Sequence, residues 1–219
     1  MNDGNGIIGV DMTDFITSDW HLGEDRFEIM GRPGFVSAQH MVDEFIFLHN
    51  ELVEPDDTVY VVGDAVNLNT PEFLSQVSHF NGRKILFRGN HDRVFTDEQL
   101  SKYFDEIVAE GDGLEIDVEG VPCWITHYPT QGRADRFNLV GHIHSAWKVQ
   151  LNSFNVGVDV NHFRPHVLNK AVPFFHKAIT EFYDQDVWVA YREINEHFKG
   201  KRGKPGRYLD VDGNVGGGS

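Results

Sequence analysis

Apolar positions in the first part of the chain alternate between strand-like and helix-like spacing. Residues 13–19, TDFITSD, combine β-branched and aromatic side chains with polar ones at the end, which is typical of a core strand that leads into a loop. From Ser37 to Val53, apolar residues recur every three or four positions behind a serine suited to capping, and this spacing predicts a helix. Residues 58–64, TVYVVGD, then indicate a second strand.

The alternation continues over the next forty or so residues. A helix is predicted over 70–80, with a threonine as N-cap and Pro71 at the first helical position. A strand follows at 83–89, RKILFRG. A further short helix begins at Thr96, where Gln99 completes a capping box. The order of strand, helix, strand, helix, strand predicts an α/β protein.

Strands dominate the second half of the chain. Short segments of β-type composition are separated by turn-forming residues, and the second and third of them form a hairpin-like pair: 106–109, 114–120, 121–127, 136–144, 147–151 and 153–160. These segments predict either a second sheet or an enlargement of the first. Helical spacing returns at 174–185, FFHKAITEFYDQ.

The chain length of 219 residues suits one large domain. We assign this domain to residues 13–198 and expect residues 1–12 to form a flexible leader. Residues 199–219 contain seven glycines and five basic residues, a composition that predicts a disordered tail.

Composition and charge narrow the possible partners and compartments. No apolar stretch approaches the roughly 18 residues of a membrane span, and the acidic start of the chain does not resemble a signal peptide, so we expect a cytoplasmic protein without a membrane partner. The formal net charge of −15 opposes an extended nucleic-acid-binding surface. Cys123 is the only cysteine, which excludes an intramolecular disulfide and a cysteine cage for zinc, and its apolar surroundings predict a buried thiol.

Polar side chains stand at the ends of five predicted strands, in the segments SDWHL, VVGDAVN, FRGNHD, THYP and GHIH. Ligands of α/β sheets collect at the carboxyl ends of strands, so these side chains can converge in space. The set consists of Asp19, His21, Asp64, Asn90, His91, His127, His142 and His144. Carboxylate oxygens, imidazole nitrogens and an amide oxygen suit manganese, iron, zinc or nickel better than calcium.

The number and spacing of these donors favour two metal ions over one. Residues two apart at a strand end point the same way, as Asp19 and His21 do, and the pair of histidines in GHIH repeats this spacing. Two ions about 3.5–4 Å apart can share one carboxylate, and we choose Asp64 as that bridge. Glycines at positions 63, 89 and 141 precede three of the donors and permit close approach of the backbone.

Taken together, the blocks resemble the signature of the calcineurin-like metallophosphoesterases: D-x-H, G-D-x-x-D, G-N-H-[DE], a single H, and G-H-x-H. All five blocks are present in this order between Asp19 and His144, and the segments NVGVDV and RPGF further resemble the compact bacterial and phage members. The resemblance implies a four-layer α-β-β-α sandwich of two mixed sheets flanked by helices, with the metals at one sheet edge.

The resemblance also implies a role for each residue of the blocks. The first metal site would consist of Asp19, His21, Asp64 and His144, and the second of Asp64, Asn90, His127 and His142. His91 would be the histidine that approaches the leaving-group oxygen. One departure is Asn67, which stands where the family usually has aspartate; it can orient an imidazole but lacks a charge to stabilise the imidazolium. Asp92 completes its block and is expected either to assist at the site or to hold the loop.

The activity implied by the resemblance is hydrolysis of phosphodiesters, with phosphomonoesters as further substrates. A hydroxide held between two metals, Mn²⁺ as first choice with Fe, Zn or Ni as alternatives, would attack phosphorus while His91 acts as general acid. We expect a small phosphorylated substrate such as a nucleotide or cyclic nucleotide diester. The alternatives are a nuclease that acts on short single-stranded ends and a nonenzymatic scaffold with the same fold.

Two residues near the blocks are candidates for substrate contacts. Arg32, in GRPGF, is expected to clamp a phosphate, because a guanidinium can hold two phosphate oxygens at once. Trp20 lies between two metal-type residues and is expected to form a pocket wall. The segments GNGIIG and DVDGN resemble nucleotide-binding and calcium-binding loops, but their contexts favour a leader and a tail segment.

Overall fold

The computed structural model describes residues 13–182. The predicted leader, the predicted tail and the end of the last predicted helix lie outside these residues. The chain divides into two compact units, Met1–His176 and Lys177–Ser219. The predicted single domain over 13–198 stays a prediction. Within the described range, no helix combines the length and the apolar character needed to cross a membrane.

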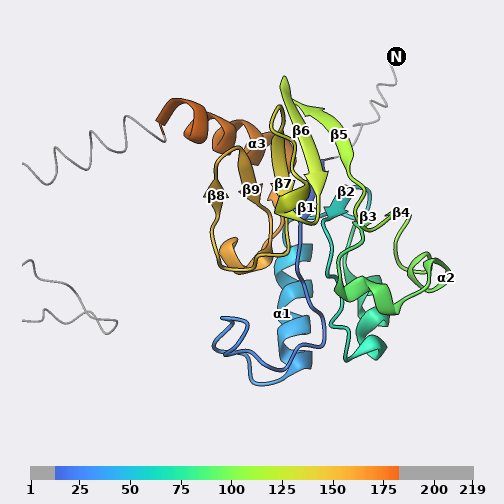
Figure 1. Cartoon of the computed structure of the whole chain (residues 1–219). Helices are drawn as coiled ribbons and strands as arrows, with labels where there is room; N and C mark the ends of the chain where they lie inside the picture. The colour runs from blue at the N-terminus through green and yellow to red at the C-terminus, as the bar shows by residue number, and fades with distance from the viewer. Residues whose placement is uncertain (1–12, 183–219) are drawn as a thin grey trace, which may run out of the picture. The chain divides into compact units, whose positions relative to one another are not determined.

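The first sheet has five strands in the order β10-β1-β2-β3-β4. Its four parallel strands are β1 (Asp14–Thr17), β2 (Thr58–Val61), β3 (Arg83–Phe87) and β4 (Glu106–Val108). The edge strand β10 (His166–Val167) pairs antiparallel with β1 and was not predicted. Since the four parallel strands point the same way, the loops after β1, β2 and β3 all emerge at one edge (Figure 1).

Helical segments connect these strands. The connections are α1 (Ala38–Asn50), the 3₁₀ segments η1 (Pro71–His79) and η2 (His91–Val94), and the short helix α2 (Asp97–Leu100). Ser37 caps α1 by accepting a hydrogen bond from the backbone N–H of His40, as predicted. The capping box of Thr96 and Gln99 is also confirmed. In contrast, the predicted helix at 70–80 is a 3₁₀ helix, and its N-cap residue Thr70 makes no capping hydrogen bond through its side chain.

The second sheet has five strands in the order β5-β6-β7-β9-β8. They are β5 (Leu114–Val118), β6 (Val121–Thr126), β7 (Phe137–Val140), β8 (Val149–Gln150) and β9 (Ser153–Asn155), and η3 (Pro129–Gln131) lies between β6 and β7. The predicted hairpin is the antiparallel β5–β6 pair, whereas β6, β7 and β9 are parallel. Strands β5 to β9 therefore form a second sheet and do not enlarge the first, which were the two arrangements that the sequence allowed.

Three helical segments depart from the prediction in the last part of the described chain. The segment predicted as strand 153–160 is a strand only as far as Asn155, and it continues into the 3₁₀ segment η4 (Val158–Val160). Helix α3 (Leu168–Lys177) begins before the predicted Phe174 and contains Pro173. It is followed by the π-helical segment η5 (Ala178–Phe182).

The two faces of the first sheet have different neighbours. Phe15, Val59 and Leu86 belong to one buried apolar cluster with Phe45 of α1 and Val77 of η1. The alternate residues on these strands, such as Ile16 and Ile85, are buried on the other face. This alternation agrees with strands that are covered on both sides.

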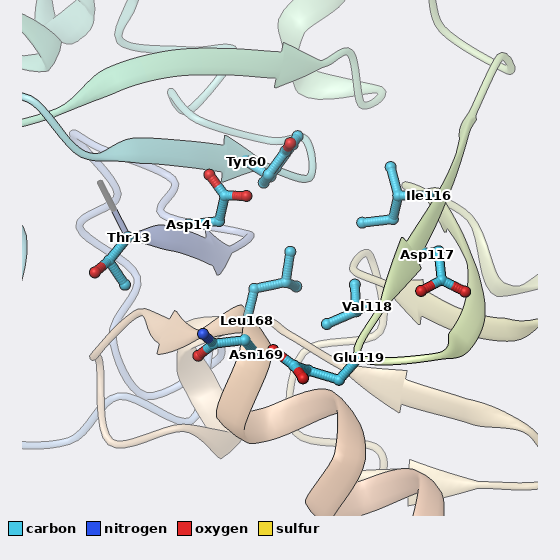
Figure 2. A pocket seen from close by; sticks show the side chains of 9 residues that line it. All are labelled: Thr13, Asp14, Tyr60, Ile116, Asp117, Val118, Glu119, Leu168 and Asn169. Atoms are coloured by element: carbon cyan, nitrogen blue, oxygen red, sulfur yellow. The ribbon is translucent and has the colours of Figure 1, made fainter. Parts of the chain in front are cut away.

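On the other face, part of the first sheet lies across from β5 of the second (Figure 2). Tyr60 and Asp14 of the first sheet, Ile116 and Val118 of β5, and Leu168 of α3 line a cavity of about 470 Å³ there. Because Asp14 begins β1, this cavity lies at the end of the strand opposite to the polar loop after β1. The fold is mixed α/β with two five-stranded mixed sheets, and the four-layer order stays a prediction.

Candidate metal centre

Five of the seven predicted metal ligands have a left-handed backbone conformation. Their φ angles are 59° for Asp19, 46° for His21, 53° for Asp64, 74° for His142 and 47° for His144. This conformation is costly for residues other than glycine, so surrounding contacts must hold it in place. In the loop after β1, the N–H groups of Asp19 and His21 donate to the carbonyls of Gly63 and Asp64, at 3.0 and 2.9 Å.

The metal-type side chains from distant parts of the chain meet in one place. Three groups have ligand atoms that all lie within 4.8 Å of one another: Asp19, His21 and His144; His21, Asp64 and His91; and Asp64, His127 and His142. The first group contains three of the four ligands predicted for the first site and lacks Asp64. The third contains three of the four predicted for the second site and lacks Asn90. The structure thus brings these predicted ligands together, whereas their binding of metal stays a prediction.

Asp64 lies between the two groups. One carboxylate oxygen, Oδ2, is 3.5 Å from the Nε2 atoms of both His21 and His127. The other oxygen, Oδ1, accepts a hydrogen bond of 2.8 Å from the backbone N–H of His91. This position between two histidines of different groups is the one a bridging carboxylate requires.

Unpaired polar atoms test whether this cluster fits a metal. Both ring nitrogens of His21, Nε2 of His127 and Oδ1 of Asn90 are buried and have no hydrogen-bond partner among the described residues. Buried polar atoms are nearly always paired, and four of the six unpaired ones among the described residues belong to this cluster, which fits a bound ligand there. The donors are nitrogen and oxygen, which suits divalent transition metals, and the residues present therefore fit such ions.

His127 presents a defined nitrogen to the cluster. Its Nδ1 donates to the carbonyl of Val62 at 2.7 Å, and since a carbonyl only accepts, Nδ1 carries the proton. In the neutral ring the lone pair is on Nε2, which lies 3.5 Å from Asp64 Oδ2. His142 completes this side of the cluster, with its ring centroid 5.2 Å from that of His127.

The charges of the cluster are poorly balanced without a cation. Burial and the nearby Asp64 charge raise the pKa of Asp19 to about 6. Burial lowers the pKa of His127, but the carboxylates of Asp64 and Asp19 outweigh it and raise the value to about 9. Burial lowers the pKa of His21 well below its ordinary value. A divalent cation would favour ionised carboxylates and neutral imidazoles at the same time.

Glycines allow these side chains to approach the backbone. A Cβ atom on Gly89 would overlap Asp64 Oδ1 and lie 2.8 Å from His127 Nε2, and a Cβ on Gly63 would overlap the His127 ring. Gly141 is packed in the same way against Ser18 and Asp19. The prediction that these three glycines permit close approach is confirmed.

His91 lies beside the cluster and is half-buried. Its ring stands perpendicular to that of His21, with 4.4 Å between the centroids. Its Nδ1 faces the backbone N–H of Leu68 at 3.4 Å. Burial lowers the pKa of His91, and the charge of Asp64 opposes this effect. In this arrangement Nδ1 is the accepting nitrogen, so Nε2 carries the proton of the neutral ring.

The predicted hydrogen bond between the Asn67 side chain and the His91 ring is absent among the described residues. Asn67 Nδ2 donates to Glu24 Oε2 at 2.6 Å, and Asn67 Oδ1 accepts from the backbone N–H of Asn69 at 2.9 Å. Glu24 is fully buried, and the hydrogen bonds and the charge of Arg26 lower the pKa of Glu24 to about 2 although burial opposes this shift. The sequence analysis missed Glu24, because a lone glutamate in a loop carries no pattern.

Asp92 holds loops together. Its buried carboxylate accepts hydrogen bonds from the backbone N–H groups of Asp64, Ala65 and Gly89, at 2.9, 3.1 and 2.9 Å. Of the two predicted roles, loop holding is the one that this geometry supports. Through these contacts, Asp92 joins the loop after β2 to the loop after β3.

Two expected substrate contacts are corrected by the structure. Arg32 has no exposed surface, and its guanidinium donates to the Asp159 carboxylate and to the carbonyls of Asp19 and Trp20, so it cannot clamp a phosphate. Trp20 is 2% exposed and stacks on Phe80 with 4.3 Å between centroids, so it belongs to the core and not to a pocket wall. Asp159, the partner of Arg32, was missed by the sequence analysis.

Comparisons with known proteins bear on the fold. No protein-family model and no curated protein matches the sequence. Among solved structures, a protein of unknown function from Aquifex aeolicus aligns with a TM-score of 0.59 and 22% identity, covering 75% of this chain and 99% of that one. This likeness shows a shared fold.

Two further solved structures align less well. An archaeal phosphodiesterase aligns with a TM-score of 0.39 and 21% identity over 67% of this chain and 82% of its own. Phosphopantetheinyl hydrolase from Mycobacterium tuberculosis aligns with a TM-score of 0.27 and 18% identity over 55% of this chain and 44% of its own. These two alignments are too weak to carry a conclusion about this chain.

Proposed function

We propose that this protein is a metal-dependent hydrolase of phosphoesters that acts on phosphodiesters. The observation that carries the proposal is the cluster of unpaired buried nitrogen and oxygen atoms around Asp64, which come from loops far apart in the sequence. Its side chains are those of the five motif blocks, in the order in which metallophosphoesterases have them.

The ligands divide into two sets that share Asp64. Asp19, His21 and His144 would hold one ion with Asp64, and Asn90, His127 and His142 would hold the other. The mixed nitrogen and oxygen donors favour Mn²⁺, with Fe, Zn and Ni as alternatives. Such ions supply Lewis-acid stabilisation of phosphate charge and activate water for hydrolysis.

His91 is the residue proposed to move a proton. The backbone N–H of Leu68 faces Nδ1, so the proton of the neutral ring is on Nε2 and is available to a departing ester oxygen. The half-buried ring is open to a substrate, unlike the fully buried Asp92. The hydrogen bond between Asn67 and Glu24 joins the loop after β2 to the loop after β1, and these two residues would act only by holding the shape of these loops.

The substrate is proposed to be a small phosphorylated molecule such as a nucleotide or cyclic nucleotide diester. The net charge of −15 disfavours long polyanions, and two bound divalent ions would change it only to about −11. A nuclease that acts on short single-stranded ends is the alternative enzyme, and a nonenzymatic scaffold is the alternative without catalysis.

The test combines metal analysis with a substrate panel. Purified protein supplied with Mn²⁺ should bind two equivalents and hydrolyse an aryl phosphodiester and a cyclic nucleotide faster than a phosphomonoester or an oligonucleotide. Asp64→Asn should reduce bound metal and abolish turnover. Asp57→Asn, which changes a buried aspartate just before β2, is the matched control and should retain both.

His91→Ala separates catalysis from metal binding. We expect turnover of an alkyl phosphodiester to fall roughly a hundredfold while both metals remain bound, because a poor leaving group needs a proton donor. Exposed His79→Ala is the control. Full metal binding by the wild-type protein without hydrolysis of any ester would favour the scaffold, and preferred cleavage of the oligonucleotide would favour the nuclease.

A further inference from the structure

A buried ion pair contacts two residues of the first proposed metal site, Asp19 and His144. Arg32, from the loop before α1, donates to Asp159 of η4 through Nε at 2.6 Å and through Nη2 at 3.1 Å. The side chains are 0% and 1% exposed. Removing two charges from water is costly, and such pairs persist where several hydrogen bonds satisfy both partners.

Both members of the pair also contact the loops that carry predicted metal ligands. Asp159 Oδ2 accepts a hydrogen bond of 2.8 Å from His144 Nδ1. The guanidinium of Arg32 donates to the carbonyl of Asp19 at 2.6 Å and to that of Trp20 at 2.9 Å. The ion pair therefore joins the loop after β1 to the loop that holds His144.

The contact with Asp159 selects the nitrogen that His144 can offer to a metal. An ionised carboxylate only accepts, so the proton of the neutral His144 ring is on Nδ1 and the lone pair is on Nε2. The two hydrogen bonds from the Arg32 guanidinium, at 2.6 and 3.1 Å, hold Asp159 as an ionised carboxylate in this buried position. A carboxylate behind a ligating histidine fixes the orientation of the ring and increases its basicity.

The contacts of Arg32 act on backbone geometry. Asp19 and His21 have φ angles of 59° and 46°, and the carbonyls of Asp19 and Trp20 lie between these two strained positions. Two charge-assisted hydrogen bonds to consecutive carbonyls fix the peptide planes at this turn. The same guanidinium is fixed in turn by Asp159, so the two loops are positioned by one unit.

We propose that Asp159 and Arg32 are positioning residues of the first metal site: Asp159 holds His144 with Nε2 toward the metal, and Arg32 holds the turn that presents Asp19 and His21. This inference rests on the proposed metal binding, but it makes a separate claim about how one of the two sites is built. It predicts that loss of the pair weakens the first site and leaves the second unchanged, because His127 is oriented independently by the Val62 carbonyl.

The first experiment measures Mn²⁺ binding by titration calorimetry in the full chain. Asp159→Asn should weaken one of the two bound ions about 10- to 100-fold and leave the other at its wild-type affinity. In this variant the buried Arg32 competes with His144 for the single remaining acceptor oxygen. Asp57→Asn is the control, since it also alters a buried aspartate that accepts backbone hydrogen bonds, at 2.8 Å from Thr13 and 2.8 Å from Glu54.

A second measurement needs no variant and therefore does not depend on folding of Asp159→Asn. In wild-type protein loaded with Zn²⁺, ¹⁵N NMR of the histidine rings should show His144 with a proton on Nδ1 and zinc on Nε2. Zinc on Nδ1 of His144 overturns the proposal. Unchanged affinity for both ions in folded Asp159→Asn also overturns it and leaves the proposed function intact, whereas failure of the wild-type protein to bind metal removes both.

Discussion

At the scale of single residues, strained backbone and unpaired atoms occur in the same place. Left-handed φ angles at Asp19, His21, Asp64 and His144 each cost on the order of 1–3 kcal/mol. The atoms that these loops direct inward include buried nitrogens of His21 without a partner. Strained backbone and unpaired buried atoms both destabilise the folded protein. Their occurrence in one cluster indicates a binding site for a ligand.

Gly89→Ala tests how closely the cluster is packed. The new methyl group would overlap Asp64 Oδ1 and crowd His127 Nε2, so we expect at least a tenfold loss of Mn²⁺ affinity while the protein remains folded. Gly120→Ala is the control: it adds a methyl group in open space at a φ of 81° and should cost about 1 kcal/mol of stability without affecting metal. Equal metal affinities in the two variants would show that Gly89 does not border the ligands.

The residues that sequence reasoning found and missed differ in a physical way. Asp19 and His21 stand two positions apart directly after a predicted strand, so the local sequence suffices to group them, although their φ angles of 59° and 46° are not those of an extended strand. Arg32 and Asp159 pair across 127 positions, and nothing in either neighbourhood indicates the partner. Without that partner, a buried arginine looks like a phosphate clamp.

At the scale of elements, local capping signals marked where α1 and α2 begin, whereas tertiary contacts determined where one predicted strand ends. The helix α1 begins after the capping serine that the sequence indicates. The alternating apolar residues of NVGVDV predict a strand. However, the N–H of Val158 donates to the carbonyl of Ser18, the residue after β1, and the Asn161 side chain donates to the carbonyls of Asn155 and Gly157. These long-range and side-chain contacts turn the segment into η4.

Ser37→Ala tests the capping of α1. Removing the hydroxyl that accepts the N–H of His40 at 3.1 Å should lower the free energy of unfolding by about 1 kcal/mol, as measured by urea denaturation. Ser37→Asp retains an acceptor at the helix N-terminus and should remain within a few tenths of a kcal/mol of the wild type. A loss of the same size in both variants would indicate that the hydroxyl acts other than as a cap.

At the scale of the whole molecule, the core contains a histidine whose protonation in acid would destabilise the folded state. His49 is 1% exposed and packs against Trp20 and Phe80, with its Nε2 at 3.1 Å from the carbonyl of Asn81. Burial lowers its pKa from 6.5 to about 4. The sequence analysis could not distinguish this histidine from a surface one.

The sign of the resulting pH dependence follows from proton binding. Between pH 6.5 and about 4 the unfolded chain binds a proton at His49 that the folded protein does not, so stability falls as the pH decreases through this window. The maximum slope from this one group is about 1.4 kcal/mol per pH unit. In denaturation curves, the free energy of unfolding of His49→Gln should decline less steeply with decreasing pH than that of the wild type. The exposed variant His79→Gln should decline as steeply as the wild type. Identical slopes in all three proteins would contradict the assignment.

Metal binding should appear in global stability because the ligands converge only in the folded chain. An ion present at 100 times its dissociation constant stabilises the folded state by about 2.7 kcal/mol for each site, so Mn²⁺ should raise the melting temperature and a chelator should reverse the shift. Ca²⁺ at the same ionic strength separates site binding from screening of the net charge of −15, since imidazole nitrogens suit Mn²⁺ better than Ca²⁺. Calorimetric scans of wild type and Asp64→Asn with each ion would measure this difference. A rise in melting temperature that is equal for Ca²⁺ and Mn²⁺, or that persists in Asp64→Asn, would assign the effect to charge screening and remove the thermodynamic support for a specific metal centre.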